Sequence, residues 1–65
     1  MKQNTMQAFS AFIYEIENEF MADCAILNLV CSGETPDEAV AKLKMRVQNT
    51  LNDPEIQINP VYERR

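Results

Sequence analysis

A chain of 65 residues is long enough for one small domain and too short for two hydrophobic cores. Its composition is 46% hydrophobic and 25% charged with a single Gly, which excludes a collagen-like or intrinsically disordered chain. Ten acidic residues against six basic ones give a net charge of −4. That sign disfavours contact with phosphate backbones, so we predict no specific binding to nucleic acid. The acidity favours either solubility alone or a surface complementary to a basic protein partner.

The residue types that usually carry catalysis and metal binding are scarce. The chain has no His and only two Cys, whereas a structural zinc site takes four Cys or His ligands. We therefore predict that the protein is not an enzyme and has no catalytic, cofactor-binding or metal-binding residues. No apolar run is long enough to cross ~30 Å of hydrocarbon. Residues 2–5 lead into no apolar signal-peptide core, so we expect a cytoplasmic protein without membrane contact.

Three short strands are expected in the first half of the chain. In residues 8–17 the side chains alternate between two faces, and both faces are apolar: Phe9, Ala11 and Ile13 on one, Phe12, Tyr14 and Ile16 on the other. Residues 17–19 predict a tight turn, residues 20–27 a second strand and residues 29–32 a third. Short connections between consecutive strands favour an antiparallel meander.

The two cysteines fall on the second and third predicted strands. A two-residue turn at Leu27 and Asn28 would place Cys24 directly opposite Cys31. In a reducing cytosol we interpret them as two small buried thiols, with a disulfide as the alternative.

The clearest local signal marks the start of a helix. Thr35 suits the N-cap, Pro36 suits the first helical position, and Glu38 completes a capping box. Lys42 follows Glu38 by four residues, which predicts an ion pair on the exposed side. The helix should run to about residue 51 and bury one stripe of side chains: Val40, Leu43, Val47 and Leu51.

The last predicted element is a fourth strand. Residues 55–59 alternate between polar and apolar side chains, and Pro60 confines this strand to an edge of the sheet or ends it. The resulting fold is α+β: a small antiparallel three-stranded meander with one helix packed on one face (β-β-β-α) and a fourth edge strand. Residues 1–65 form one domain, and we expect residues 1–7 and 63–65 to fray.

The stretch from Phe20 to Leu43 resembles the HicB-like antitoxin domains. The family's aromatic residue and following strand end are matched by Phe20, Ala22, Asp23 and Cys24. Its strand-to-helix junction is matched by Gly33, Thr35, Pro36, Glu38 and Ala39. The resemblance covers about residues 9–51 and implies a partial RNase H-like β-β-β-α fold.

The sequence also departs from the family pattern. Asn18 stands where the family usually has Gly, and Ala25 where it usually has Pro. Only about fourteen residues follow Leu51, too few for the DNA-binding domain that full HicB proteins carry. We therefore expect no operator binding.

The resemblance implies a non-enzymatic antitoxin that binds and neutralises a small basic toxin ribonuclease. One alternative is a small acidic inhibitor of mobile-element origin that blocks a host nucleic-acid enzyme. Another is a self-assembling structural protein with no toxin partner. The candidate partner-binding residues are four acids: Glu15, Glu17, Glu19 and Asp23. A metal site of an RNase H-like nuclease would also need such acids, but at a turn or strand end we interpret them as solvated.

We further predict a homodimer or higher oligomer. A domain of this size buries only about 60% of the surface of its unfolded chain, which makes it marginal alone. One helix covers one face of the sheet, so apolar side chains remain on the other face. The predicted interface residues are Phe12, Tyr14, Ile16, Ile56 and Ile58.

Overall fold

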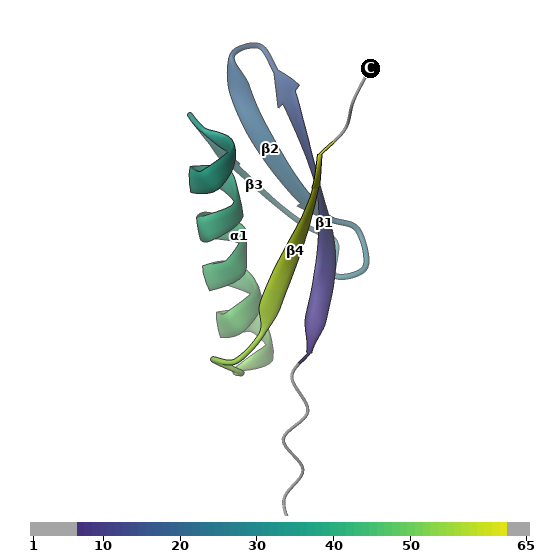
Figure 1. The fold of residues 1–65 in the computed structure, drawn as a ribbon. Helices are drawn as coiled ribbons and strands as arrows, with labels where there is room; N and C mark the ends of the chain where they lie inside the picture. The colour runs from purple at the N-terminus through teal and green to yellow at the C-terminus, as the bar shows by residue number, and fades with distance from the viewer. Residues whose placement is uncertain (1–6, 63–65) are drawn as a thin grey trace, which may run out of the picture.

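The computed structural model describes residues 7–62, which form a four-stranded sheet with one helix packed on one face (Figure 1). In chain order the elements are β1 (Ala8–Ile16), β2 (Glu19–Cys24), β3 (Leu29–Gly33), α1 (Pro36–Leu51) and β4 (Gln57–Tyr62). The strands lie in the order β3-β2-β1-β4. The α+β fold is therefore confirmed, with its three-stranded meander, its single helix and its fourth edge strand. Residues 1–6 and 63–65, which we expected to fray, lie outside the described residues.

Strands β1 and β2 form a hairpin with a two-residue turn. Glu17 and Asn18 both have positive φ, 49° and 70°, and Ile16 pairs with Glu19 across the turn. Two consecutive positive φ values are typical of a type I′ turn, whose twist suits an antiparallel hairpin. A tight turn was predicted over residues 17–19. The turn consists of Glu17 and Asn18, because Glu19 already belongs to β2.

The connection from β2 to β3 differs from the prediction. It spans residues 25–28, where Leu27 N–H donates to the Cys24 carbonyl at 3.2 Å and Asn28 adopts a φ of 59°. Strand β2 therefore ends at Cys24, three residues earlier than expected. Cys24 pairs with Leu29, and Cys31 pairs with Ala22. The expectation that the two cysteines lie opposite each other is wrong, and both are free thiols.

Helix α1 begins and ends where its caps predict. The hydroxyl of Thr35 accepts the Glu38 N–H at 3.1 Å, and the Glu38 carboxylate accepts the Glu34 N–H at 2.8 Å. At the other end Asn52 has a φ of 53°. The N–H of Asp53 donates to the Gln48 carbonyl at 3.0 Å, which closes the last turn.

Strand β4 pairs in parallel with β1, so the sheet is mixed. Gln57 N–H donates to the Gln7 carbonyl at 2.9 Å, which also holds Gln7 at the described end of the chain. In a parallel strand, the backbone N–H groups of alternate residues point to the same neighbouring strand. Because the N–H of Gln57 points toward the β1 side, the backbone N of Pro60, three residues later, points to the open edge of the sheet. Its missing N–H breaks no ladder bond there, and β4 continues to Tyr62.

The core lies between α1 and the inner face of the sheet. Its fully or almost fully buried residues are Ala11, Ile13, Ala22, Cys24, Ala39, Leu43, Val47 and Ile56. On α1 the buried stripe uses Ala39, while Val40 is only half-buried and Leu51 is exposed. This corrects the two ends of the predicted stripe. The helix packs mainly on β3 and β2, at one side of the sheet.

Two predicted interface residues belong to this core or pack against it. Ile56 is 0% exposed, and Ile58 is half-buried and packs against the core. Ile58 lies next to Phe9 in the parallel pairing and so shares its face. The predicted interface role of Ile56 is wrong, because the described fold buries its side chain completely. That of Ile58, which lies on the helix side of the sheet, stays a prediction.

Candidate protein-binding surfaces

Six carboxylates gather at one end of the molecule, which we call the acidic end. There the β1–β2 hairpin lies beside the start of α1 (Figure 1, top), because Phe20 of β2 pairs with Gly33 at the end of β3. A hollow of about 340 Å³ lies between these segments and is lined by Glu19, Glu34 and Glu38 among others. All six side chains are exposed: Glu15, Glu17, Glu19, Glu34, Asp37 and Glu38.

Within residues 7–62, little positive charge offsets the acidic end. Residues 7–62 contain nine Asp or Glu and three Lys or Arg, and all three cations lie on α1. The ion pair found among them joins Lys42 Nζ to Glu38 Oε2 at 3.7 Å, as the helical spacing predicted. Both side chains are about half exposed, so solvent weakens this pair. The acidic end therefore keeps a negative field that attracts cations.

The sequence-predicted acids divide between two places. Glu15, Glu17 and Glu19 lie at the acidic end, whereas Asp23 lies farther along β2, away from the hairpin turn, where it pairs with Phe12 and Val30. Three further acids at the acidic end were not predicted as binding residues: Glu34 before α1, and Asp37 and Glu38 in its first turn. Their position beside the hairpin depends on the register of β2 with β3. The spacing of residues within one strand or helix does not reveal this register.

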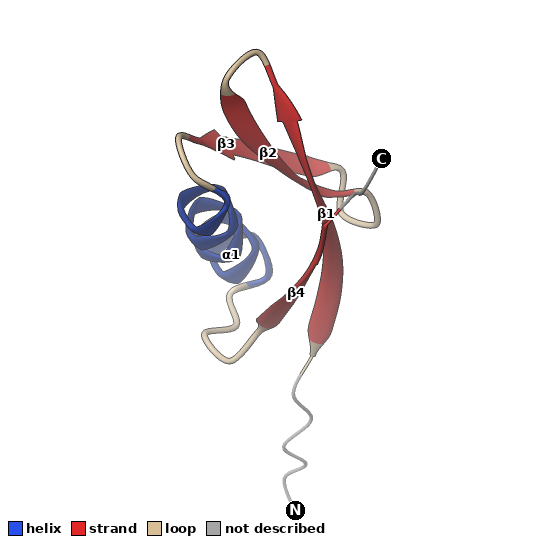
Figure 2. Cartoon of the chain, turned by 45° about the horizontal axis from the view of Figure 1, so that its top comes forward, coloured by secondary structure: helices blue, strands red, loops and turns tan. Residues whose placement is uncertain are grey.

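One side of the sheet is turned away from α1 (Figure 2), and we call it the outer face. The register places six apolar side chains on it: Phe12, Tyr14, Ile16, Met21, Val30 and Val61. Four of them are between 41% and 49% exposed, and Tyr14 and Met21 are half-buried. Phe12, Tyr14 and Ile16 share one face of β1, as the alternation predicted, and the structure shows that the helix leaves this face uncovered. Their role in an interface remains a prediction.

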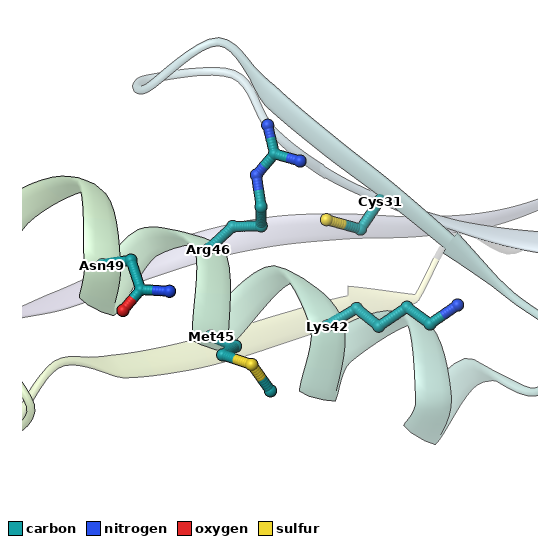
Figure 3. A pocket seen from close by; sticks show the side chains of 5 residues that line it. All are labelled: Cys31, Lys42, Met45, Arg46 and Asn49. Carbon is teal, nitrogen blue, oxygen red and sulfur yellow. The ribbon is translucent and has the colours of Figure 1, made fainter.

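A second hollow, of about 260 Å³, lies between β3 and α1 (Figure 3). Cys31 comes from the strand, and the helix contributes a stripe spaced by three and four residues: Lys42, Met45, Arg46 and Asn49. Met45 is 60% exposed, in agreement with its place outside the buried stripe. The hollow offers two cations and a thioether beside the edge of β3.

Neither hollow resembles a metal centre. Within residues 7–62 no group of three or more His, Cys, Asp or Glu is placed to hold a metal ion. The same residues contain no helix with the length and apolar character needed to cross a bilayer.

No protein-family model, curated protein or solved structure matches this chain. The family resemblance of residues 20–43 therefore stays a prediction, and the function has to be argued from the surfaces.

Proposed function

We propose that this chain is a non-enzymatic protein-binding module: a HicB-like antitoxin that acts in the cytoplasm by binding a small basic toxin ribonuclease. The observation that carries the proposal is the acidic end, with six exposed carboxylates and one paired cation. The β-β-β-α order of the fold agrees with the order that the resemblance implies.

The strand-to-helix junction holds the two halves of the acidic end together. Gly33 is buried, and a Cβ atom there would lie 2.8 Å from the backbone N of Ala39 and 2.9 Å from the Cβ of Glu38. Any side chain at this position would push the first turn of α1 away from the sheet. The Gly of the family-like junction thus has a physical role, because it lets Glu38 approach the hairpin.

Charge explains how such a surface would neutralise a ribonuclease. An RNA-binding surface holds phosphates with Lys and Arg, and the acidic end would compete for those cations. Opposite charges also speed the encounter of two proteins. Exposed charges are screened over ~8 Å at physiological ionic strength, so binding should weaken as the salt concentration rises.

The test needs a defined partner, and the first choice is a short basic reading frame adjacent to the gene. Its product is purified, and RNA cleavage and binding are measured with and without this chain. We expect inhibition that Glu17→Gln with Glu19→Gln weakens by about tenfold, since each exposed carboxylate contributes ~0.2–1 kcal/mol. The control is Asp53→Asn with Glu55→Gln, beyond the other end of α1, which removes the same charge. Cleavage unaffected by this chain, or equal losses in both double variants, would contradict the proposal.

The acidic end equally supports a second candidate function, an acidic inhibitor of mobile-element origin that blocks a host nucleic-acid enzyme. In that case the partner is encoded away from this gene. Capture from host lysate, followed by inhibition of the purified enzyme, would favour this candidate. Under both proposals, duplex DNA and RNA should not bind specifically at physiological salt.

A further inference from the structure

We propose that the outer face binds a second copy of this chain, so that two sheets stack face to face with their helices on the outside. This goes beyond the proposed function, which uses the acidic end. Of the six carboxylates of the acidic end, Glu19 lies on the outer face, so the homodimer would leave the other five of each copy free for a basic partner.

The apolar side chains of the outer face form a row along an interior strand. Phe12, Tyr14 and Ile16 follow one another along β1, and the neighbouring strands add Met21, Val30 and Val61. Among the described residues, the charges on this face are Asp23 and Glu19. Asp23 lies between Phe12 and Val30, so one carboxylate interrupts an otherwise apolar surface. Contiguous apolar surface of this kind commonly marks a protein interface.

This arrangement is self-complementary about a two-fold axis parallel to β1. Such an axis places β1 against β1 of the other copy, and β2 against β4 of the other copy. Asp23 then faces the strand that carries Val61 instead of a second Asp23, so two carboxylates are not buried together. Sheets stacked in this way lie about 10 Å apart, with their side chains in contact.

The size of the face indicates a reversible dimer. Its four strands, at a spacing of about 4.8 Å, make it about 19 Å wide, and three apolar rows make it about 20 Å long. Two copies would together cover about 800 Å² in projection, below the ~1,200–2,000 Å² typical of stable complexes. We therefore expect association at micromolar concentrations.

Two further features favour a second copy at this face. The core is small, since three of its eight buried residues are Ala and one is Cys. Domains below about 70 residues commonly gain stability from an additional contact such as oligomerisation. Pairing through the open edge of β4 is disfavoured, because Pro60 faces that edge without an N–H to donate.

Sedimentation equilibrium of the full chain at increasing concentration tests the proposal. We expect the mass to rise from 7.5 kDa toward twice that value. Phe12→Lys should weaken association about tenfold or more, because it places a charge in the apolar centre. Asp23→Asn should tighten association, because a carboxylate no longer has to lose water. Met45→Lys is the matched control, since Met45 is exposed on α1 and lies outside the outer face. Circular dichroism reports whether each variant is folded.

Three results would overturn the proposal: a mass of 7.5 kDa at all concentrations, association unchanged by Phe12→Lys, or equal weakening by Met45→Lys. If Phe12→Lys does not fold, Tyr62→Phe provides a second measurement. The chain has no Trp and two Tyr, so Tyr14 becomes the fluorescent reporter of the outer face. Its emission should change with protein concentration, and constant emission would contradict the dimer. High salt should preserve this dimer while weakening the contact at the acidic end, so the two proposals fail separately.

Discussion

The two faces of the sheet come from the same strands and differ in how much of their apolar surface is buried. The inner face of the sheet combines small residues, Ala11, Ala22 and Cys24, all 0% exposed, with Ile13, which is 2% exposed. The outer face carries Phe12 and Ile16, which are almost half exposed. Small residues let the helix approach the sheet closely, and α1 supplies Leu43 and Val47 to fill the space. Burial here therefore follows helix packing and does not follow side-chain size.

This difference assigns a separate task to each face. The inner face holds the monomer together, because its contacts form when one chain folds. Within residues 7–62 the outer face leaves large apolar side chains partly in water, where a second molecule would bury them. Substitutions that distinguish folding from association therefore provide the sharpest tests of the comparison.

The largest expected effect is on the inner face. Leu43→Ala should lower the free energy of unfolding by about 2–5 kcal/mol, because a fully buried side chain leaves a cavity. A 65-residue domain has only about 3–10 kcal/mol in total, so this variant should be largely unfolded. Phe12→Ala should cost no more than about 1 kcal/mol in the monomer, since a half-exposed side chain buries less area. Urea denaturation at concentrations below association measures both, and equal losses would contradict the division between the faces.

The next largest effect concerns the junction that places α1 on the inner face. Gly33→Ala should destabilise the fold by about 1–3 kcal/mol, because the added methyl group would lie 2.8 Å from a backbone atom of α1. Ser32→Ala, the preceding position on the opposite face, is the control. A Gly33→Ala variant as stable as the wild type would show that the helix can move away without loss.

Features determined by neighbouring residues could be predicted from the sequence. The cap at Thr35 and the end of α1 near residue 51 depend on side chains within one turn of the helix. The two faces of β1 follow from its alternation, and the structure confirms them. Local hydrogen bonds and strict periodicity leave few competing arrangements, so these predictions were reliable.

Features that depend on distant pairing could not be predicted. The parallel pairing of β4 with β1 joins residues about fifty positions apart, and it turns Ile58 toward the core. The turn at residues 25–28 set the register that separates Cys24 from Cys31. The same register completes the acidic end with Glu34 and Glu38. In each case, several registers satisfy the same apolar pattern, and tertiary packing selects one of them.

A smaller effect on stability is expected at the solvent-exposed N-cap of α1. Thr35→Ala should lower the free energy of unfolding by about 1 kcal/mol, because the Glu38 N–H loses its hydroxyl acceptor. Thr50→Ala, at an exposed position near the other end of α1, removes the same atoms without removing a cap. Thermal denaturation of the two variants should therefore differ. Equal midpoints would indicate that the Glu38 side chain alone holds the start of the helix.

The smallest predicted effect links the hairpin to the acidic end. Glu17 has a φ of 49°, and the left-handed region costs an ordinary side chain about 1 kcal/mol or more. Asn tolerates this region better, so Glu17→Asn should raise the free energy of unfolding by about 0.5 kcal/mol. Glu17→Gln removes the same charge, but Gln tolerates the left-handed backbone conformation no better than Glu. This variant should therefore leave the free energy of unfolding unchanged. Both variants should bind a basic partner more weakly, because both remove one of six carboxylates at the acidic end. Urea denaturation and partner binding, measured on both variants, separate the effect of backbone strain from the effect of charge. If the Gln variant is stabilised as much as the Asn variant, the gain comes from reduced repulsion between carboxylates at the hairpin.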